Sequence, residues 1–284
     1  QLPVSLQSDP LNARGLRLLG QILFLEGDTA KARALMAKAS DLSTHELLAH
    51  DIMLRINAAE KRYQSALFYG NRLFSAAPDL IGGDADIMIP FLHDRATRNA
   101  LVEMLARRPV WRPYFFNLFI PKIAATDLNA ARSLYDSLNI KDQQTSAPEL
   151  NSLLNALIRN NRLDVAYATW LMYLPAEKTD MIGFINNGGF EYEPSAAPFD
   201  WNISGGKEAK AKIAPIPFGK GNLGLNVEFG LGRATFPSIY QYIILAPGHY
   251  RFRGAYQGDI AAKRGLQWTI TCLNGNRSGE SDML

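Results

Sequence analysis

The first two-thirds of the chain show apolar positions at helical spacing, interrupted by short polar turns. The dipeptide Asp9-Pro10 predicts the start of a first helix, and Gly27-Asp28 predicts its end. A second helix follows, in which the small residue Ala32 lets the two backbones approach closely. The apolar positions of the first helix are Leu16, Leu19, Leu23 and Phe24, and those of the second are Ala32, Leu35, Met36 and Ala39.

The paired pattern continues along the chain at a regular spacing. Ala66 lies 34 residues after Ala32 in an equivalent position, and Pro78 closes this second unit. Weaker echoes follow at three further alanines, so that five units can be placed over residues 10–178. The predicted helices of the second and third units span 47–57, 63–76, 84–92 and 95–106, and the later alanines are Ala100, Ala131 and Ala166.

A period of 34 residues with small residues at the helix crossings resembles the tetratricopeptide repeat, a helix-turn-helix unit. The resemblance implies that residues 1–180 form an α-solenoid, in which each unit buries its apolar face against its neighbours. Such a stack presents a concave surface that holds a protein partner. The alternative for this region is an irregular helical bundle.

From Met181 onward the helical period stops, and alternating residues with glycines and prolines predict strands. Apolar and polar positions alternate in Leu223–Phe229, and Pro247-Gly248 predicts a turn between two strands. About seven strands in the last third indicate an antiparallel β-sandwich over residues 181–284, so the expected fold class is α then β, in two domains. The predicted strands span 182–192, 200–204, 209–216, 223–229, 240–245, 250–256 and 266–273.

Two motifs of the last third resemble the jelly-roll carbohydrate-binding modules of the galactose-binding-like group. The first comprises Ile185–Glu191 with Phe199-Asp200-Trp201, and the second is Leu245–Phe252. Such modules need another strand or two, so we expect an incomplete jelly roll: either the C-terminus is truncated, or something else covers an open sheet edge. The layout of repeats followed by a jelly roll resembles uncharacterised bacterial envelope proteins.

The jelly-roll resemblance implies a sugar site, in which aromatic faces stack on pyranose rings and polar side chains bind the hydroxyl groups. The aromatic candidates are Trp201, Tyr240, Tyr242, Tyr256 and Trp268, and the polar candidates are Arg251, Arg253 and Gln257. The alternative is that these aromatic residues form the core of the sandwich. The resemblance also places Glu191 where related modules hold a structural calcium ion, which needs six to eight oxygen ligands.

The bulk composition narrows the function classes. The 284 residues are 47% hydrophobic and 20% charged, which is typical of a globular rather than a disordered protein. A net charge of +3 does not favour nucleic-acid binding, which needs a clustered basic surface, and no apolar run is long enough to span a bilayer. Cys272 is the single cysteine, so no intrachain disulfide can form, and its alternation with Trp268 and Ile270 predicts a small buried side chain.

Motifs that usually carry catalysis are incomplete in this sequence. His45 and His50 are five residues apart, whereas a zinc-protease helix needs histidines four apart so that both face one metal. The glycine pattern over 219–224 leads into a predicted strand rather than a helix, which indicates a β-turn loop instead of a dinucleotide site. No catalytic residue is predicted, and calcium is the one cofactor considered. The stretch Arg107–Pro113 predicts a helix end and a connecting loop, where an exposed Trp111 would suit a protein interface.

Three functions stay open at this stage. The first is a non-enzymatic adaptor, whose repeats hold a protein partner and whose sandwich binds a polysaccharide or a second protein. The second is a structural subunit of a larger envelope or membrane-associated assembly, and the third is a glycan-acting enzyme with paired carboxylates among Glu191, Glu193 and Asp200. The expected location is the periplasm or cell envelope, with the cytoplasm as the alternative. Because the chain starts at Gln1 rather than Met, we expect that a signal or membrane anchor was removed upstream.

Overall fold

The chain divides into two compact units, Gln1–Leu174 (unit 1) and Pro175–Leu284 (unit 2), and each is described by itself. Within the described part of the chain, no helix combines the length and the apolarity needed to cross a bilayer. The computed structural model describes residues 9–142, 145–204, 206–207, 209–217, 222–230, 236, 238–258 and 265–282.

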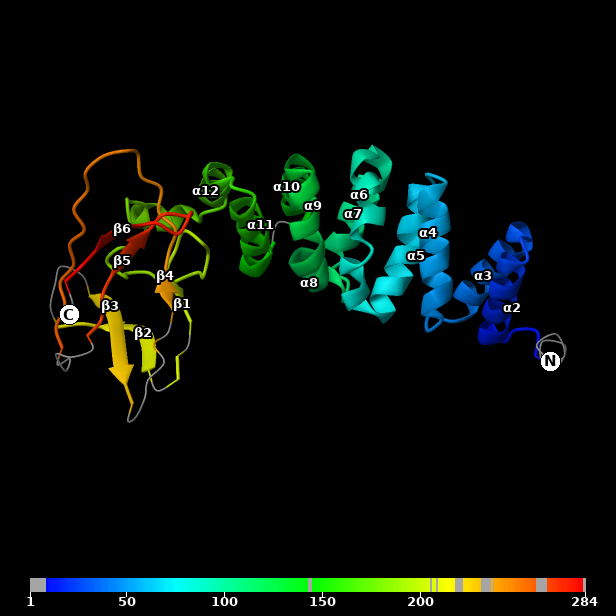
Figure 1. The fold of residues 1–284 in the computed structure, drawn as a ribbon, viewed down its shortest axis with the longest axis horizontal. Coiled ribbons are helices and arrows are strands. Elements are labelled where there is room, and N and C mark those ends of the chain that lie inside the picture. Colours follow the sequence, from blue (N-terminus) through cyan, green and yellow to red (C-terminus); the bar gives the residue numbers. More distant parts are fainter. Residues whose placement is uncertain are drawn as a thin grey trace. The chain divides into compact units, whose positions relative to one another are not determined.

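Unit 1 is built from α-helices and short helical turns (Figure 1). Its first half contains α2 (Ala13–Leu25), α3 (Thr29–Leu42), α4 (Leu47–Ala59), α5 (Tyr63–Ala76), the 3-10 turn η1 (Pro78–Gly82), α6 (Ala85–His93) and α7 (Arg95–Ala106). Its second half contains α8 (Arg112–Tyr114), the π-helical turn η2 (Phe115–Phe119), α9 (Ile120–Thr126), α10 (Leu128–Asp142), α11 (Ala147–Arg159) and α12 (Leu163–Met172).

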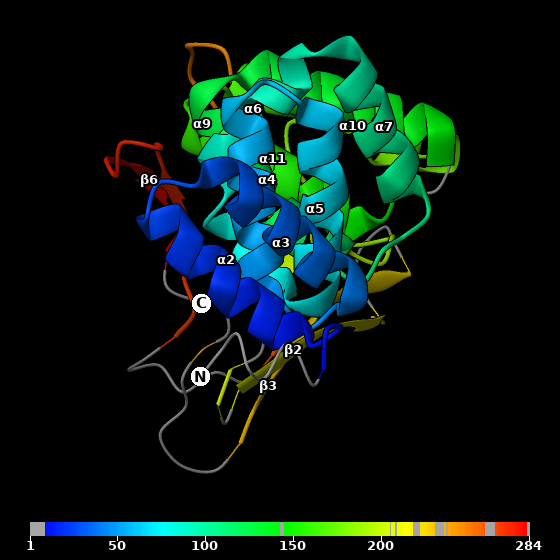
Figure 2. The same ribbon diagram turned by 90° about the vertical axis from the view of Figure 1, so that its right-hand side faces the viewer.

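Helices that follow one another in the chain pack as pairs. The pairs are α2 with α3, α4 with α5, α6 with α7, α9 with α10, and α11 with α12. Each pair also contacts the next one, through α3 and α4, α5 and α7, α7 and α10, and α9 and α11. Figure 2, in which α2 and α3 face the viewer, shows α4 and α5 behind them.

The small residues of the 34-residue pattern lie at these helix contacts. Ala32, Ala66, Ala131 and Ala166 are all buried, whereas Ala100 is partly exposed. Gly20 of α2 has the same role, because a Cβ atom there would lie 3.2 Å from the carbonyl oxygen of Ala32. The predicted burial of the repeated alanines is therefore confirmed at four of the five positions.

The predicted helix boundaries agree closely with the structure where local signals are strong. The helices predicted over 63–76 and 95–106 have those bounds in α5 and α7. Between α2 and α3, Gly27 adopts a φ of 89°, and the side chain of Asp28 accepts a hydrogen bond from the Lys31 N–H group. Glycine readily adopts a positive φ and aspartate is a preferred N-cap residue, so this turn could be predicted from the sequence.

The helical segment after Trp111 was missed by the sequence analysis. Residues 112–126 form α8, η2 and α9, whereas only a loop was predicted up to Pro113. The wide π turn precedes Pro121, which lacks an N–H group and crowds the carbonyl four residues before it. Trp111 is only 1% exposed, and its Nε1–H group donates to Asn71 Oδ1 over 2.9 Å. The expected exposure of Trp111, on which its proposed partner-binding role depended, is therefore wrong, because its ring belongs to the core.

Unit 2 contains a short 3-10 turn and small antiparallel sheets. Strand β1 pairs with β4, β2 with β3 and β5 with β6, giving three two-stranded sheets among the described residues. In the longest ladder, Ala209 lies opposite Phe229 and Pro215 lies opposite Leu223. The elements are η3 (Ala176–Met181), β1 (Asn202–Ile203), β2 (Ala209–Pro215), β3 (Leu223–Phe229), β4 (Ile239–Tyr240), β5 (Thr269–Thr271) and β6 (Arg277–Glu280).

Several strand predictions in unit 2 differ from the structure. Segments 182–192 and 250–256 contain no strand, and the strand over 277–280 was not predicted. The described strands do not close into a sandwich, because each sheet has only two strands. Cys272 is exposed rather than buried, since β5 ends at Thr271 and the Cys272 carbonyl accepts from the Gly275 N–H group in the following turn.

Candidate functional site

An apolar hollow of about 330 Å³ lies between the first three described helices of unit 1. Gly20 lines it, and because glycine has no side chain, α2 and α3 approach each other closely there. The lining residues are Gly20, Gln21, Phe24 and Leu25 from α2, Ala32, Arg33 and Met36 from α3, and Ile52, Arg55 and Ile56 from α4. We call this hollow the α2–α4 pocket.

The C-terminal end of α2 gives the pocket an apolar rim. Phe24 is 53% exposed and Leu25 is 86% exposed, although both are large apolar side chains. Phe24 belongs to the apolar positions that predict the contact face of the first helix, but in the structure its side chain is exposed. The sequence does contain a signal for this exposure. Leu18, Ile22 and Leu25 are also apolar, so α2 is apolar on more than one face and cannot bury all of its apolar side chains.

Two arginines line the pocket, and acidic residues pair with both of them. Arg33 forms two hydrogen bonds with the carboxylate of Glu60, at 3.0 and 2.5 Å. Arg55 contacts Asp51 at 2.8 Å and Asp84 at 2.5 Å. Burial raises the pKa of the Asp84 carboxyl, and the nearby Arg55 offsets this only in part. The pocket therefore offers an apolar surface whose lining cations are already neutralised.

Arg55 also borders a second hollow, of about 400 Å³. Leu47 and Leu48 of α4 line it together with Leu73 of α5 and Leu80 of η1. Arg55 thus borders both hollows, and its partners Asp51 and Asp84 also line the second one. An amphipathic or extended segment with two apolar anchors matches this arrangement.

His50 lies at the contact between α3 and α4 and is fully buried. Its Nε2–H group donates to the Thr44 carbonyl at 3.2 Å, so the neutral ring accepts at Nδ1 from the Ser40 hydroxyl at 2.7 Å. Burial lowers the pKa of this imidazole, with a smaller contribution from Arg72 in the same direction. The five-residue spacing from His45 excluded a zinc pair, and the structure gives His50 a packing role.

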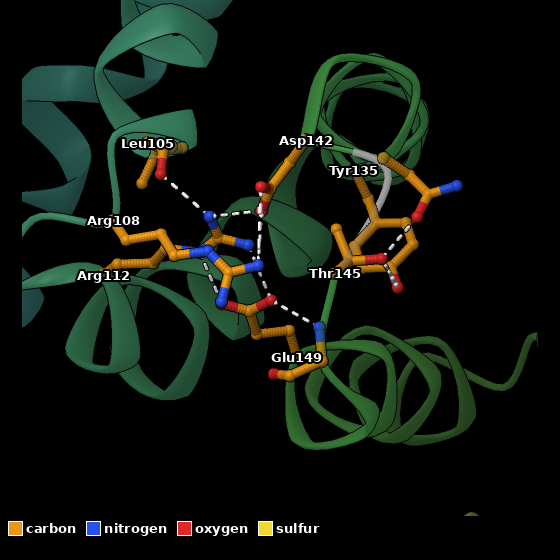
Figure 3. Close-up of polar contacts among 9 residues, drawn as sticks. Leu105, Arg108, Arg112, Tyr135, Asp142, Thr145 and Glu149 are labelled. Atoms are coloured by element: carbon orange, nitrogen blue, oxygen red, sulfur yellow. Dashed lines mark hydrogen bonds and ion pairs between the residues drawn. The ribbon is translucent and has the colours of Figure 1, made fainter.

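A cluster of buried charges lies deeper in unit 1 (Figure 3). The guanidinium group of Arg112 lies between two carboxylates, contacting Asp142 at 2.7 Å and Glu149 at 2.5 and 2.8 Å. It also donates to the Leu105 carbonyl at 2.9 Å. Because the Glu149 carboxylate also accepts from the Ser146 N–H group at the start of α11, the cluster ties α8 to α10 and α11. Arg108 also contacts Asp142, at 3.4 Å, so two guanidinium groups balance the two carboxylates. These contacts fit a structural brace better than a reactive site.

The predicted sugar-binding aromatics fall into separate groups in unit 2. The rings of Tyr240 and Tyr242 lie 6.0 Å apart, and Tyr240 is exposed. Trp201 is only 6% exposed, because its ring stacks on Phe190 and lies 5.5 Å from Trp268. The remaining candidates, Tyr256, Arg251, Arg253 and Gln257, are exposed. The structure thus brings together Tyr240 with Tyr242 and Trp201 with Trp268, without joining all eight residues into one site.

The motif that carried the jelly-roll resemblance forms a buried polar network. The Asn187 side chain bridges the N–H and C=O groups of Tyr192. The backbone carbonyl of Asn187 accepts from the Trp201 indole N–H group at 2.9 Å. The Asp200 carboxylate accepts from the N–H and hydroxyl groups of Ser195 and from the Trp201 N–H group. These side chains form hydrogen bonds with the backbone groups of a loop, whereas a strand was expected over 182–192.

Glu191, proposed for calcium or catalysis, also has structural partners. The Glu191 carboxylate faces the backbone N–H groups of Asn222 and Leu223, at 3.3 and 3.4 Å. These N–H groups are hydrogen-bond donors and cannot ligate calcium, so this arrangement does not fit a calcium site at Glu191. Among the described residues, no group of three or more His, Cys, Asp or Glu side chains is placed to hold a metal ion.

Fold and surfaces together define a helical protein with a small antiparallel β region and an apolar pocket between its first helices. A comparison with models of known protein families finds no match. A comparison with curated protein sequences finds no match either.

Proposed function

We propose that this protein is a non-enzymatic adaptor whose unit 1 holds a segment of a protein partner. The observation that carries the proposal is the α2–α4 pocket, with the exposed Phe24 and Leu25 at its rim. Filling such a recess with one apolar side chain of a partner contributes about 1.5–3 kcal/mol. Because acidic residues already pair with Arg33 and Arg55, the pocket favours apolar anchors over charged ones.

We also propose a fold type for each unit. Buried alanines at a 34-residue spacing support a tetratricopeptide-like stack for unit 1. For unit 2 we propose a jelly-roll-like domain that binds glycan or a second protein, with the exposed Tyr240 beside Tyr242 as the aromatic contact for a sugar ring. We place the protein in the periplasm or cell envelope, with the cytoplasm as the alternative.

Peptide selection on the full chain tests the adaptor proposal. A displayed library of random peptides is selected on the wild-type chain, and the affinity of enriched peptides is measured by fluorescence anisotropy. We expect Phe24→Asp to weaken their binding about tenfold or more, because it places a charge in the apolar rim. Matched control Ile140→Asp changes a 77% exposed apolar residue near the end of α10, and it should leave binding within about twofold.

Two results would contradict the adaptor proposal. One is equal weakening by Phe24→Asp and Ile140→Asp, which would show that the pocket is not used. The other is an absence of enriched peptides after selection on the folded full chain. For the glycan part, Tyr240→Ala should reduce retention of the chain on a polysaccharide gel, while Tyr114→Ala in unit 1 should not.

A second candidate is a structural subunit of a larger envelope or membrane-associated assembly. The observation that favours it is the number of large apolar side chains exposed on unit 2, including Phe184, Phe229 and Leu273. In this case the tagged chain should co-purify from its native cells with other proteins at fixed stoichiometry. Recovery of the tagged chain as a free monomer would contradict the subunit role.

A further inference from the structure

The segment from residue 243 to 258 in unit 2 runs outside every helix and strand (Figure 1, orange). Its neighbour Tyr242 donates its N–H group to the Pro198 carbonyl at 2.8 Å. Beyond that point, the described residues provide no backbone–backbone hydrogen bond to residues 243–258. Residues 246–258 are all exposed, and the one hydrogen bond to their backbone among the described residues is donated by the Tyr250 hydroxyl group to the Ala246 carbonyl at 2.8 Å, which leaves the backbone groups of residues 249–253 available to a partner.

Within this segment the side chains alternate as they do in a strand. Tyr250 and Phe252 face the body of unit 2, since their rings lie 5.8 Å from Phe184 and 6.0 Å from Trp268. Arg251 lies between these two residues and Arg253 follows them, and both arginines are exposed. Two-residue alternation with aromatic residues on the inner side is the pattern of a sheet edge.

The two arginines have no acidic partner among the described residues, in contrast to Arg33, Arg55 and Arg112 of unit 1. Opposite charges directly across two strands stabilise their pairing, and like charges destabilise it. The outer side of the segment therefore matches an incoming strand with carboxylates at alternate positions. Its inner side matches small or branched apolar residues against Tyr250 and Phe252.

We propose that residues 249–253 bind an extended segment of another protein by strand addition, and that this segment alternates acidic and apolar residues. The inference rests on the proposed adaptor function of unit 2 and names the chemistry of its protein partner. A second copy of this chain is a poor occupant. Antiparallel self-pairing centred on Arg251 or Phe252 places arginine opposite arginine, which is unfavourable.

A synthetic peptide tests the proposal on the full chain. The probe is fluorescently labelled Ser-Thr-Glu-Val-Glu-Val-Glu-Thr-Ser, and its binding is followed by anisotropy at low salt. One control peptide carries lysine in place of glutamate. Another keeps the glutamates but is N-methylated at each Glu and Val, which removes the backbone donors while preserving the charge.

We expect the acidic peptide to bind the wild-type chain, and the lysine and N-methylated peptides to bind about tenfold more weakly or not at all. The double variant Arg251→Glu/Arg253→Glu should reverse the preference, so that it binds the lysine peptide. Matched control Lys38→Glu/Arg107→Glu makes the same change in net charge at exposed positions of unit 1 and should keep the wild-type preference. Reversal of preference also shows that the double variant is folded.

Four outcomes would overturn the proposal. Equal binding of the N-methylated peptide would indicate charge attraction without strand pairing, and an unchanged preference in the double variant would place the contact elsewhere. Binding of polygalacturonate through Arg251 and Arg253 without peptide binding would identify an acidic glycan as the ligand. Dimerisation that depends on these arginines, seen by sedimentation, would identify a second copy. Phe24→Asp should leave binding of the acidic peptide unchanged, so failure here is distinguishable from failure of the α2–α4 pocket.

Discussion

Arg112 and Arg108 show how burial determines the contribution of an ion pair to the stability of this protein. Both contact the carboxylate of Asp142, but the side chain of Arg112 is 5% exposed and that of Arg108 is 54% exposed. A buried pair that loses one partner leaves an uncompensated charge, whereas an exposed pair exchanges its partner for water. Neither role could be predicted from the sequence, where both arginines lie in one basic stretch.

Arg112→Met is therefore expected to destabilise unit 1 strongly. Removal of the guanidinium group leaves the carboxylates of Asp142 and Glu149 facing each other, which costs about 3–5 kcal/mol of the free energy of unfolding. The control Arg108→Met should cost less than about 1 kcal/mol. Urea unfolding followed by circular dichroism measures both, and similar costs for the two variants would contradict the burial argument.

His50 predicts how stability depends on pH. The pKa of the folded state is lowered by burial, so above the ordinary value of about 6.5 both folded and unfolded chains hold the neutral ring. As the pH falls below this value, the unfolded chain takes up the proton first, and stability is lost. The hydrogen bond to the Thr44 carbonyl raises this pKa in part, as do Glu46 and Asp41, and Arg72 lowers it further.

The variant His50→Gln isolates this effect. Between about pH 7.5 and about pH 5.5, the free energy of unfolding of the wild-type chain should fall more than that of His50→Gln. Urea midpoints at the two pH values measure the difference. Parallel losses in both chains would show that carboxylates, and not His50, determine the acid dependence.

At the scale of elements, predictions succeeded where a local signal determines the structure. Gly27 and Asp28 form the predicted turn, and the helices over 63–76 and 95–106 have the predicted bounds. Predictions failed where distant contacts decide. Trp111 is buried against α5, where its ring contacts Phe74 and its indole N–H group donates to Asn71. The expected strand over 182–192 is replaced by a loop held by Asn187 and Asp200. Pairing of strands depends on register and partners that alternation alone does not supply.

The repeated alanines give a test at this scale. Ala66→Leu adds bulk at a residue of α5 that is fully buried, and it should cost about 1–3 kcal/mol. Ala100→Leu makes the same change at a partly exposed position and should remain within about 0.5 kcal/mol. Thermal and urea unfolding of the two variants measure the contrast. Equal costs would show that the 34-residue spacing does not mark the helix contacts.

At the scale of the whole molecule, each unit has parts that other residues do not pack against. In the second half of unit 1 an aromatic chain fills the core, with Trp111, Phe115, Phe116 and Tyr135 in successive ring contacts. The first helices leave the α2–α4 pocket open, and among the described residues of unit 2 no backbone–backbone hydrogen bond joins residues 243–258 to other segments. The candidate pocket could not be predicted from the sequence, because it arises where three helices meet.

Hydrogen exchange on the full chain tests the central claim most directly. A peptide selected on the wild-type chain is added at saturation, and exchange of backbone amides is followed by mass spectrometry. Contact at the α2–α4 pocket predicts slower exchange in residues 13–25 and 47–59, with residues 128–142 unchanged. Saturated binding with no slowing in α2 and α4 would contradict the account.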